Sequence, residues 1–212
     1  AFTKATVNAR SSSPFLEVLR RYRQELLISV SIVVMWTVCT YVLLFYMQTY
    51  AMHVLKLPAS TGFAGSMASG VIMMLTAPFF GWLADRCGYK RVLSGAALLI
   101  FILAYPLYSY LNHAPAAGSL ICVQIVFGLL SAAYTGPIPA AFADLFPTRV
   151  LSTGLSTAYN LTVMLIGGFA PFYLTFLSHT FDPTLAPVAY VMIAALVSFT
   201  GTLWLRPTSN PG

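Results

Sequence analysis

One short segment, residues 81–91 (GWLADRCGYKR), holds much of the scarce charge in this chain, of which only 8% is charged. Its ionisable side chains are Asp85, Arg86, Tyr89, Lys90 and Arg91. A carboxylate among cations can form charge-assisted hydrogen bonds, worth about 1.5–3 kcal/mol each, to a basic group or to the amino end of a helix. The segment is therefore suited to binding across an interface.

The segments on either side of this cluster are apolar and long enough to cross a membrane. The chain is 58% hydrophobic, whereas soluble domains carry about a quarter charged residues. A hydrocarbon core of ~30 Å needs about 20 apolar residues per helix. Six stretches meet that standard: residues 26–50, 63–83, 92–111, 119–140, 152–177 and 185–205. We expect an all-α membrane protein with a linker and interfacial helix (1–25), a six-helix transmembrane bundle (26–206) and a tail (207–212).

The distribution of basic residues predicts the orientation of the bundle. If the amino terminus is cytoplasmic, every Lys and Arg except Lys56 falls on the inner side. These inner residues are Lys4, Arg10, Arg20, Arg21, Arg23, Arg86, Lys90, Arg91, Arg149 and Arg206. Such a bias is what the positive-inside rule predicts for an even number of spans. We expect a multi-pass protein of the inner (plasma) membrane with both termini in the cytoplasm.

The segment before the first span has the signals of a short helix. Ser13 is a candidate N-cap, Pro14 suits the first helical position, and Glu17 suits the positive end of the helix dipole. Its apolar residues recur on one side, opposite a basic side, so the helix can lie at the inner membrane interface. A solvated linker is the alternative interpretation.

Other classes of function find little support in the sequence. The three cysteines, Cys39, Cys87 and Cys122, have the spacing of neither a metal site nor a disulfide framework, so we expect no cofactor and no metal. The net charge of +6 is explained by membrane topology, and we expect no nucleic-acid partner. We also expect no enzyme, because the nucleophile elbow and the zinc-protease histidine pair are both missing.

Two glycines and one acid in segment 81–91 each have a structural role. Asp85 follows the second span, where the helix dipole is already negative, so its carboxylate needs a compensating partner. Gly81 would allow another helix to approach closely, and Gly88 would permit the tight turn into the third span. The alternative is a short positive-inside loop with no further role.

The spacing of this segment closely resembles the cytoplasmic loop motif of the major facilitator superfamily, with Tyr89 where a basic residue is common. Residues 144–149 (DLFPTR), with the glycines and Asn160 that follow, look like helices ten and eleven of its metabolite:proton symporter family, of the citrate or organic-acid type. Residues 46–50 (YMQTY) resemble helix seven. Gln48 replaces a frequent Pro, and Leu151 replaces the usual Arg, with Arg149 two residues earlier as its substitute.

This resemblance implies that the chain is the carboxyl-terminal half of a transporter, helices 7–12, and part of a longer protein. Its partners would be the amino-terminal six-helix half, the lipid bilayer, protons and a small-molecule substrate. The resemblance also implies a cytoplasmic gate, whose bonds to the other half bias inward-open against outward-open states. Its residues would be Gly81, Asp85, Arg86, Gly88, Lys90, Arg91, Asp144 and Arg149.

Near mid-depth the six stretches contain no Asp, Glu, Lys or Arg. Buried ionisable groups normally carry proton relays and anion sites, so the companion half would have to supply them. This half offers polar and aromatic residues as substrate-path candidates, namely Tyr41, Gln48, Gln124, Ser131 and Asn160. The alternative is that these residues form ordinary hydrogen bonds between packed helices, worth about 0.6 kcal/mol each.

The sequence therefore predicts half of a secondary active transporter, which moves a small metabolite, most simply an organic acid, with protons by alternating access. A facilitator for sugars or zwitterions of the same superfamily is the first alternative. A non-transporting six-helix membrane scaffold is the second.

Overall fold

The computed structural model describes residues 14–180 and 184–205. Its described residues form helices joined by short connections. The elements are α1 (Pro14–Arg21), α2 (Arg23–Val38), η1 (Cys39–Tyr46), α3 (Met47–His53), α4 (Ala59–Cys87), α5 (Tyr89–His113), α6 (Ala117–Thr135), α7 (Ile138–Leu145), α8 (Leu151–Thr162), η2 (Val163–Gly168), α9 (Ala170–Thr180) and α10 (Ala186–Leu203). The predicted N-cap Ser13, the basic residues Lys4, Arg10 and Arg206, and the predicted tail lie outside the described residues.

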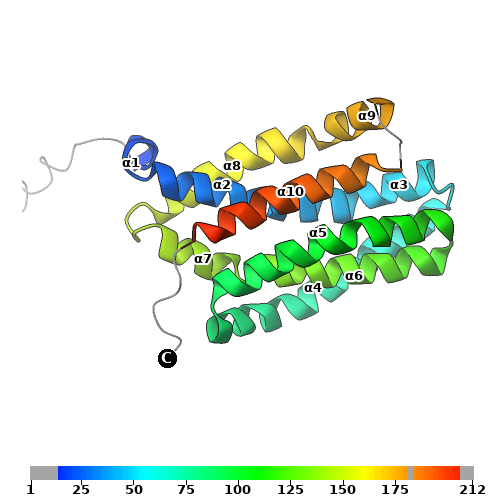
Figure 1. Ribbon diagram of the computed structural model, residues 1–212, viewed down its shortest axis with the longest axis horizontal. Coiled ribbons are helices and arrows are strands. Elements are labelled where there is room, and N and C mark those ends of the chain that lie inside the picture. Colours follow the sequence, from blue (N-terminus) through cyan, green and yellow to red (C-terminus); the bar gives the residue numbers. More distant parts are fainter. Residues whose placement is uncertain (1–13, 181–183, 206–212) are drawn as a thin grey trace, which may run out of the picture.

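Six helical segments are long and apolar enough to span a membrane, which confirms the predicted architecture. They are Arg23–His53, Ala59–Cys87, Tyr89–His113, Ala117–Leu145, Leu151–His179 and Ala186–Leu203. Figure 1 shows them side by side and running lengthwise, whereas α1 is seen nearly end-on and lies across their direction. Because successive spans alternate in direction, the start of α2, the α4–α5 turn, the α7–α8 connection and the end of α10 share one end of the bundle.

Three of the described spans are interrupted. The first and fifth contain the π-helical segments η1 and η2, which no pattern in the sequence predicted. The fourth breaks between α6 and α7, where Pro137 is the N-cap of α7 and Pro139 lies in its first turn. By contrast, Pro78 and Pro106 lie within the continuous helices α4 and α5.

The most extensive helix packing joins α4 to α6, and small residues make it possible. A Cβ atom on Gly128 would lie 2.5 Å from the Ser69 carbonyl oxygen, and one on Gly136 would lie 2.6 Å from that of Ala77. Small residues at a crossing allow two backbones to approach, which is how helices associate in lipid without a hydrophobic driving force. The fourth span is consequently the most buried of the six, whereas the second exposes its other side.

A second contact joins α2 to α10 through a serine hydroxyl. Ser198 accepts a hydrogen bond from the Met35 N–H (3.0 Å) and donates one to the Ser31 carbonyl (2.5 Å). These two backbone groups are four residues apart, so they would otherwise bond to each other in an α-helix. The hydroxyl therefore ties α10 directly into the backbone of the first span.

Candidate functional site

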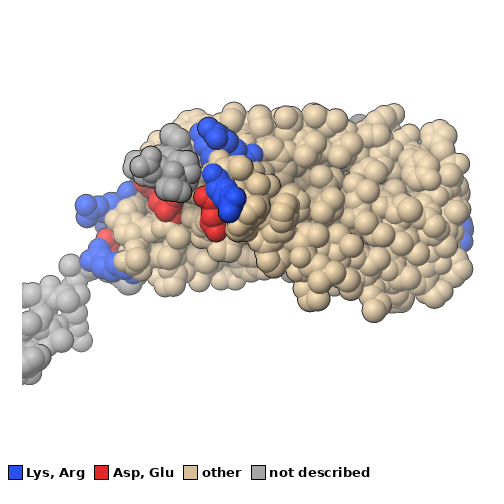
Figure 2. All heavy atoms as spheres, turned by 90° about the horizontal axis from the view of Figure 1, so that it is seen from below, with Lys and Arg blue, Asp and Glu red and all other residues tan. Residues whose placement is uncertain are grey.

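The described charged side chains gather at one end of the bundle (Figure 2). They come from α1, the start of α2, the α4–α5 turn, the end of α7 and the residues just before α8. Lys56, in the connection from α3 to α4, lies at the opposite end. Within the described spans no Asp, Glu, Lys or Arg lies near mid-depth. We call the charged end the loop end.

The turn between α4 and α5 is the centre of the loop end. Gly88 has φ 88° and ψ 127°, a backbone conformation that residues with a Cβ rarely adopt, so the glycine is what permits this turn. Asp85 is exposed and forms no ion pair with any described residue. Arg86 lies over the ring of Trp82, with its guanidinium carbon 4.3 Å from the ring centroid. The carboxylate is therefore available to a partner outside the described chain.

Lys90 binds within its own half. Its Nζ donates hydrogen bonds of 2.7 Å to the carbonyl oxygens of Leu203 and Leu205, at the end of α10. The last carbonyls of a helix have no partner in that helix and carry the negative end of its dipole, so a lysine there satisfies both. The sequence motif placed Lys90 in the gate but gave no sign of this cap, because the partner lies more than 100 residues away.

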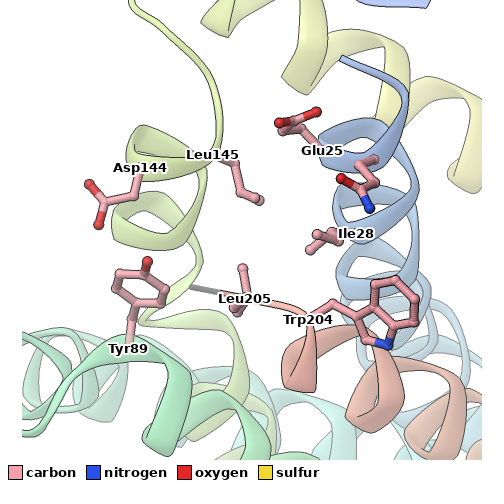
Figure 3. Close-up of a pocket in the computed structure, with 8 residues that line it drawn as sticks. Glu25, Ile28, Tyr89, Asp144, Leu145, Trp204 and Leu205 are labelled. Atoms are coloured by element: carbon pink, nitrogen blue, oxygen red, sulfur yellow. The ribbon is translucent and has the colours of Figure 1, made fainter. Parts of the chain in front are cut away.

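Tyr89 and Asp144 meet on one side of a pocket of about 120 Å³, drawn in Figure 3. The Tyr89 hydroxyl points toward the Asp144 carboxylate and donates a hydrogen bond to it. Glu25 from α2 and Trp204 from the end of α10 line the other side. The hydrogen bond joins the start of α5 to α7, so the residue that departs from the family motif has a partner in this chain.

Arg149 forms an ion pair with Glu17 of α1. Tyr22, which follows α1, packs edge-to-face on Phe146 with ring centroids 6.4 Å apart, and Val18 is fully buried. These contacts hold α1 against the α7–α8 connection. The sequence identified Glu17 only as a favourable charge for a helix dipole, because no local spacing relates it to Arg149.

Two of the substrate-path candidates lie inside the half. Gln124 and Ser131 on α6 are both 0% exposed. Gln124 lies against Gly65 of α4 and makes a 3.5 Å contact with the Ser66 hydroxyl. In this structure Gln124 belongs to the α4–α6 contact, and contact of either side chain with substrate stays a prediction.

The remaining candidates, Tyr41, Gln48 and Asn160, do not lie together. Tyr41 is 36% exposed and its ring packs against Gly167 of η2, whereas the backbone of Gln48 lies against Gly62 of α4. Tyr41 lies within the π-helical segment η1 and Gln48 follows it, so the two do not follow a single α-helical face. Asn160 on α8 is exposed.

An aromatic pair near these candidates was missed by the sequence reasoning. Trp36 of α2 and Tyr159 of α8 pack with ring centroids 5.0 Å apart, and Tyr159 remains 37% exposed. We call this pair the aromatic face. In η1 the rings of Tyr41 and Phe45 lie 6.3 Å apart. Aromatic residues are common in apolar spans, so no signal in the sequence distinguished Trp36 and Tyr159.

Replacing Lys90 with Gln should loosen the end of α10. Two hydrogen bonds from a charged donor would be lost, at about 1.5–3 kcal/mol for each intact bond and less at this partly exposed site. Hydrogen exchange of the backbone amides of Thr202 to Leu205 should accelerate. Arg91→Gln, which removes the neighbouring exposed charge, is the control, and equal exchange in the two variants would contradict the cap.

Comparison with known proteins is consistent with this arrangement. The chain is 27% identical over 196 residues to the glycine betaine/proline/ectoine/pipecolic acid transporter OusA of Dickeya dadantii, covering 92% of this chain and 39% of that protein. The proline/betaine transporter of Escherichia coli K12 is 26% identical with the same coverage. The citrate-proton symporter of Salmonella typhi is 30% identical over 174 residues, covering 82% of this chain and 40% of that protein.

The chain thus spans well under half of the length of these relatives. No solved structure matches it significantly. The sequence profile of the Major Facilitator Superfamily matches residues 60–212, which is most of the chain. With six apolar spans, a loop motif turning at Gly88 and these relatives, the chain belongs to the Major Facilitator Superfamily.

Proposed function

We propose that this chain forms the carboxyl-terminal half of a secondary transporter that moves a small, carboxylate-bearing metabolite together with protons. The observation that carries the proposal is the contrast between the charged loop end and the uncharged mid-depth of the described spans. A proton and a carboxylate both need ionisable or strongly polar partners inside a membrane protein. The companion half would supply these partners, and this half would supply a neutral wall and the gate.

The substrate class follows from chemistry that the relatives' named substrates share. Proline, betaine, ectoine, pipecolic acid and citrate all carry a carboxylate. The aromatic face favours a zwitterion within this class, because ring faces attract ammonium groups. A simple organic acid is the second candidate, and the citrate-proton symporter among the relatives favours it.

The loop end is assigned to the cytoplasm in this proposal. Of the described basic residues, only Lys56 lies at the opposite end, and positive charge concentrates on the cytoplasmic side of membrane proteins. Asp85, Arg86 and Arg91 would then face the amino-terminal half across the cytoplasmic gate. Tyr89 and Lys90 would keep the same turn attached to α7 and α10, so that the turn moves with its own half.

Uptake by the full-length protein in liposomes tests the proposal. An inwardly directed proton gradient should drive accumulation of proline, glycine betaine or citrate, and collapsing the gradient should abolish it. Uptake of glucose independent of the gradient would contradict it. Tyr159→Leu should raise the KM for glycine betaine about threefold or more, the value of one exposed cation–π contact, while leaving the KM for citrate unchanged.

A further inference from the structure

The two π-helical segments leave backbone carbonyls that need donors. In a π-helix each N–H bonds to the carbonyl five residues earlier, and the Met47 N–H reaches the Val42 carbonyl in this way at the end of η1. When the helix returns to four-residue spacing, one carbonyl is skipped. A carbonyl without a donor is costly at membrane depth, where no water replaces it.

A hydroxyl group from a neighbouring helix donates to one carbonyl of each π-helical segment. Ser66 of α4 donates to the Leu44 carbonyl of η1 at 2.7 Å. Tyr190 of α10 donates to the Ile166 carbonyl of η2 at 2.8 Å. Leu44 is the third residue from the end of η1, and Ile166 is the third residue from the end of η2. Two independent contacts thus place a hydroxyl donor at the same position of the two segments.

The sequence of η2 makes its carbonyl especially dependent on such a donor. The residue five positions after Ile166 is Pro171, which has no N–H. Other hydroxyls, such as those of Thr76, Thr157 and Ser178, bond to the carbonyl four residues earlier in their own helix. Ser66 and Tyr190 instead reach across to a different span.

The two segments also meet, and they do so at a substrate-path candidate. A Cβ atom on Gly167 of η2 would lie 2.9 Å from both the Thr37 methyl group and the Tyr41 ring. Tyr41 belongs to η1, and its ring therefore rests on the other π-helical segment. The shape of both segments decides where this ring lies.

We propose that Ser66 and Tyr190 are positioning residues, whose hydroxyls hold the first and fifth spans in π-helical form and so orient Tyr41, α3 and α9. Their place in a transport cycle rests on the function proposed above. If either segment reverted to an α-helix, the part of the span beyond it would turn by about 100°, the angle of one residue in a helix with 3.6 residues per turn. The Ser66 hydroxyl therefore fixes which side chains of the first span face inward, and the Tyr190 hydroxyl does the same for the fifth span.

Cysteine labelling of the full-length protein tests this without any transport measurement. Cys39, Cys87 and Cys122 are first replaced, and a single cysteine is placed at exposed Thr49 of α3 or at buried Leu174 of α9. Both neighbours of Thr49 are less exposed than it is, and both neighbours of Leu174 are more exposed. Rotation of the span in either direction should therefore bury the cysteine at position 49 and expose the cysteine at position 174.

Ser66→Ala should slow labelling at Thr49→Cys, and Tyr190→Phe should accelerate labelling at Leu174→Cys. We expect changes of about 3-fold to about 15-fold, the range that one interhelical hydrogen bond provides in a membrane protein. Ser66→Thr keeps a hydroxyl and should label like the parent. The matched controls are Thr76→Val, which loses a bond within its own helix, and Tyr173→Phe, whose ring stacks on Tyr190.

Unchanged labelling in both Ser66→Ala and Tyr190→Phe would overturn the proposal. Equal changes in the control variants would also overturn it, because they would reflect general loosening of the bundle. Labelling that shifts as expected in a protein that takes up no carboxylate-bearing metabolite would leave the positioning role intact and reject the proposed substrate. The two proposals can therefore fail separately.

Discussion

Asp85→Asn in the full-length protein is expected to lower transport about tenfold to a hundredfold. The carboxylate is exposed at the loop end and pairs with no described residue, so in the proposed gate its partner is the other half. Charge-assisted hydrogen bonds contribute roughly 1.5–3 kcal/mol, and a change of that size shifts a two-state equilibrium by this factor. Initial uptake rates, together with labelling from each side of the membrane, measure the effect.

The amount and thermal stability of Asp85→Asn protein should stay near those of the parent, because the change is nearly isosteric and leaves the apolar packing of α4 intact. Cys87→Ser, two residues along the same exposed turn, is the control for local disturbance and should transport normally. Asp85→Glu keeps the charge and should recover part of the activity. Normal uptake and unchanged labelling in Asp85→Asn would reduce the turn to a topology signal.

The fold was predictable because membrane insertion imposes a simple rule. Each span needs about 20 apolar residues, and every turn between spans is marked by charge, Pro or Gly. The turn at Gly88 was predictable for the same local reason, since its positive φ follows from a glycine between two long helices. Features of this kind depend on neighbouring residues in the sequence and on the solvent.

The π-helical segments could not be predicted, because they depend on partners in other spans. Nothing near Leu44 in the sequence indicates that the Ser66 hydroxyl will meet its carbonyl. The same holds for Lys90, whose partners at the end of α10 are brought to it only by folding. The one local sign of a break in helical hydrogen bonding is Pro171, which follows η2 and has no N–H.

The candidate site divides in the same way. The motif residues of the α4–α5 turn lie together at the loop end, because a short turn keeps them together in any fold. The substrate-path residues were chosen as polar and aromatic side chains in apolar spans, and the structure places the Tyr41 ring against η2 but the backbone of Gln48 against α4. For Gln124 and Ser131, polarity alone could not distinguish a pocket wall from the packed interior of the helical bundle.

The largest effect on stability is expected for Gly128→Ala, which adds a methyl group inside the α4–α6 contact. The added Cβ would lie 2.5 Å from the carbonyl oxygen and 3.0 Å from the Cα of Ser69. Both are backbone atoms of α4, so no side chain can move aside, and the two helices must separate. Overpacking of this kind costs typically 1–3 kcal/mol, and separating the helices would also weaken their neighbouring contacts. Thermal unfolding of the full-length protein in detergent should show a clearly lower transition temperature.

Gly118→Ala is the matched control, because Gly118 lies on the same helix with nothing within 4 Å of the added carbon. Alanine is favoured over glycine in a helix by roughly 0.5–1 kcal/mol, so this variant should be as stable as the parent or more stable. The two variants make the same chemical change in α6 and differ only in what the new methyl group meets. If Gly128→Ala unfolds at the same temperature as Gly118→Ala, then α4 and α6 do not cross as closely as their small residues require.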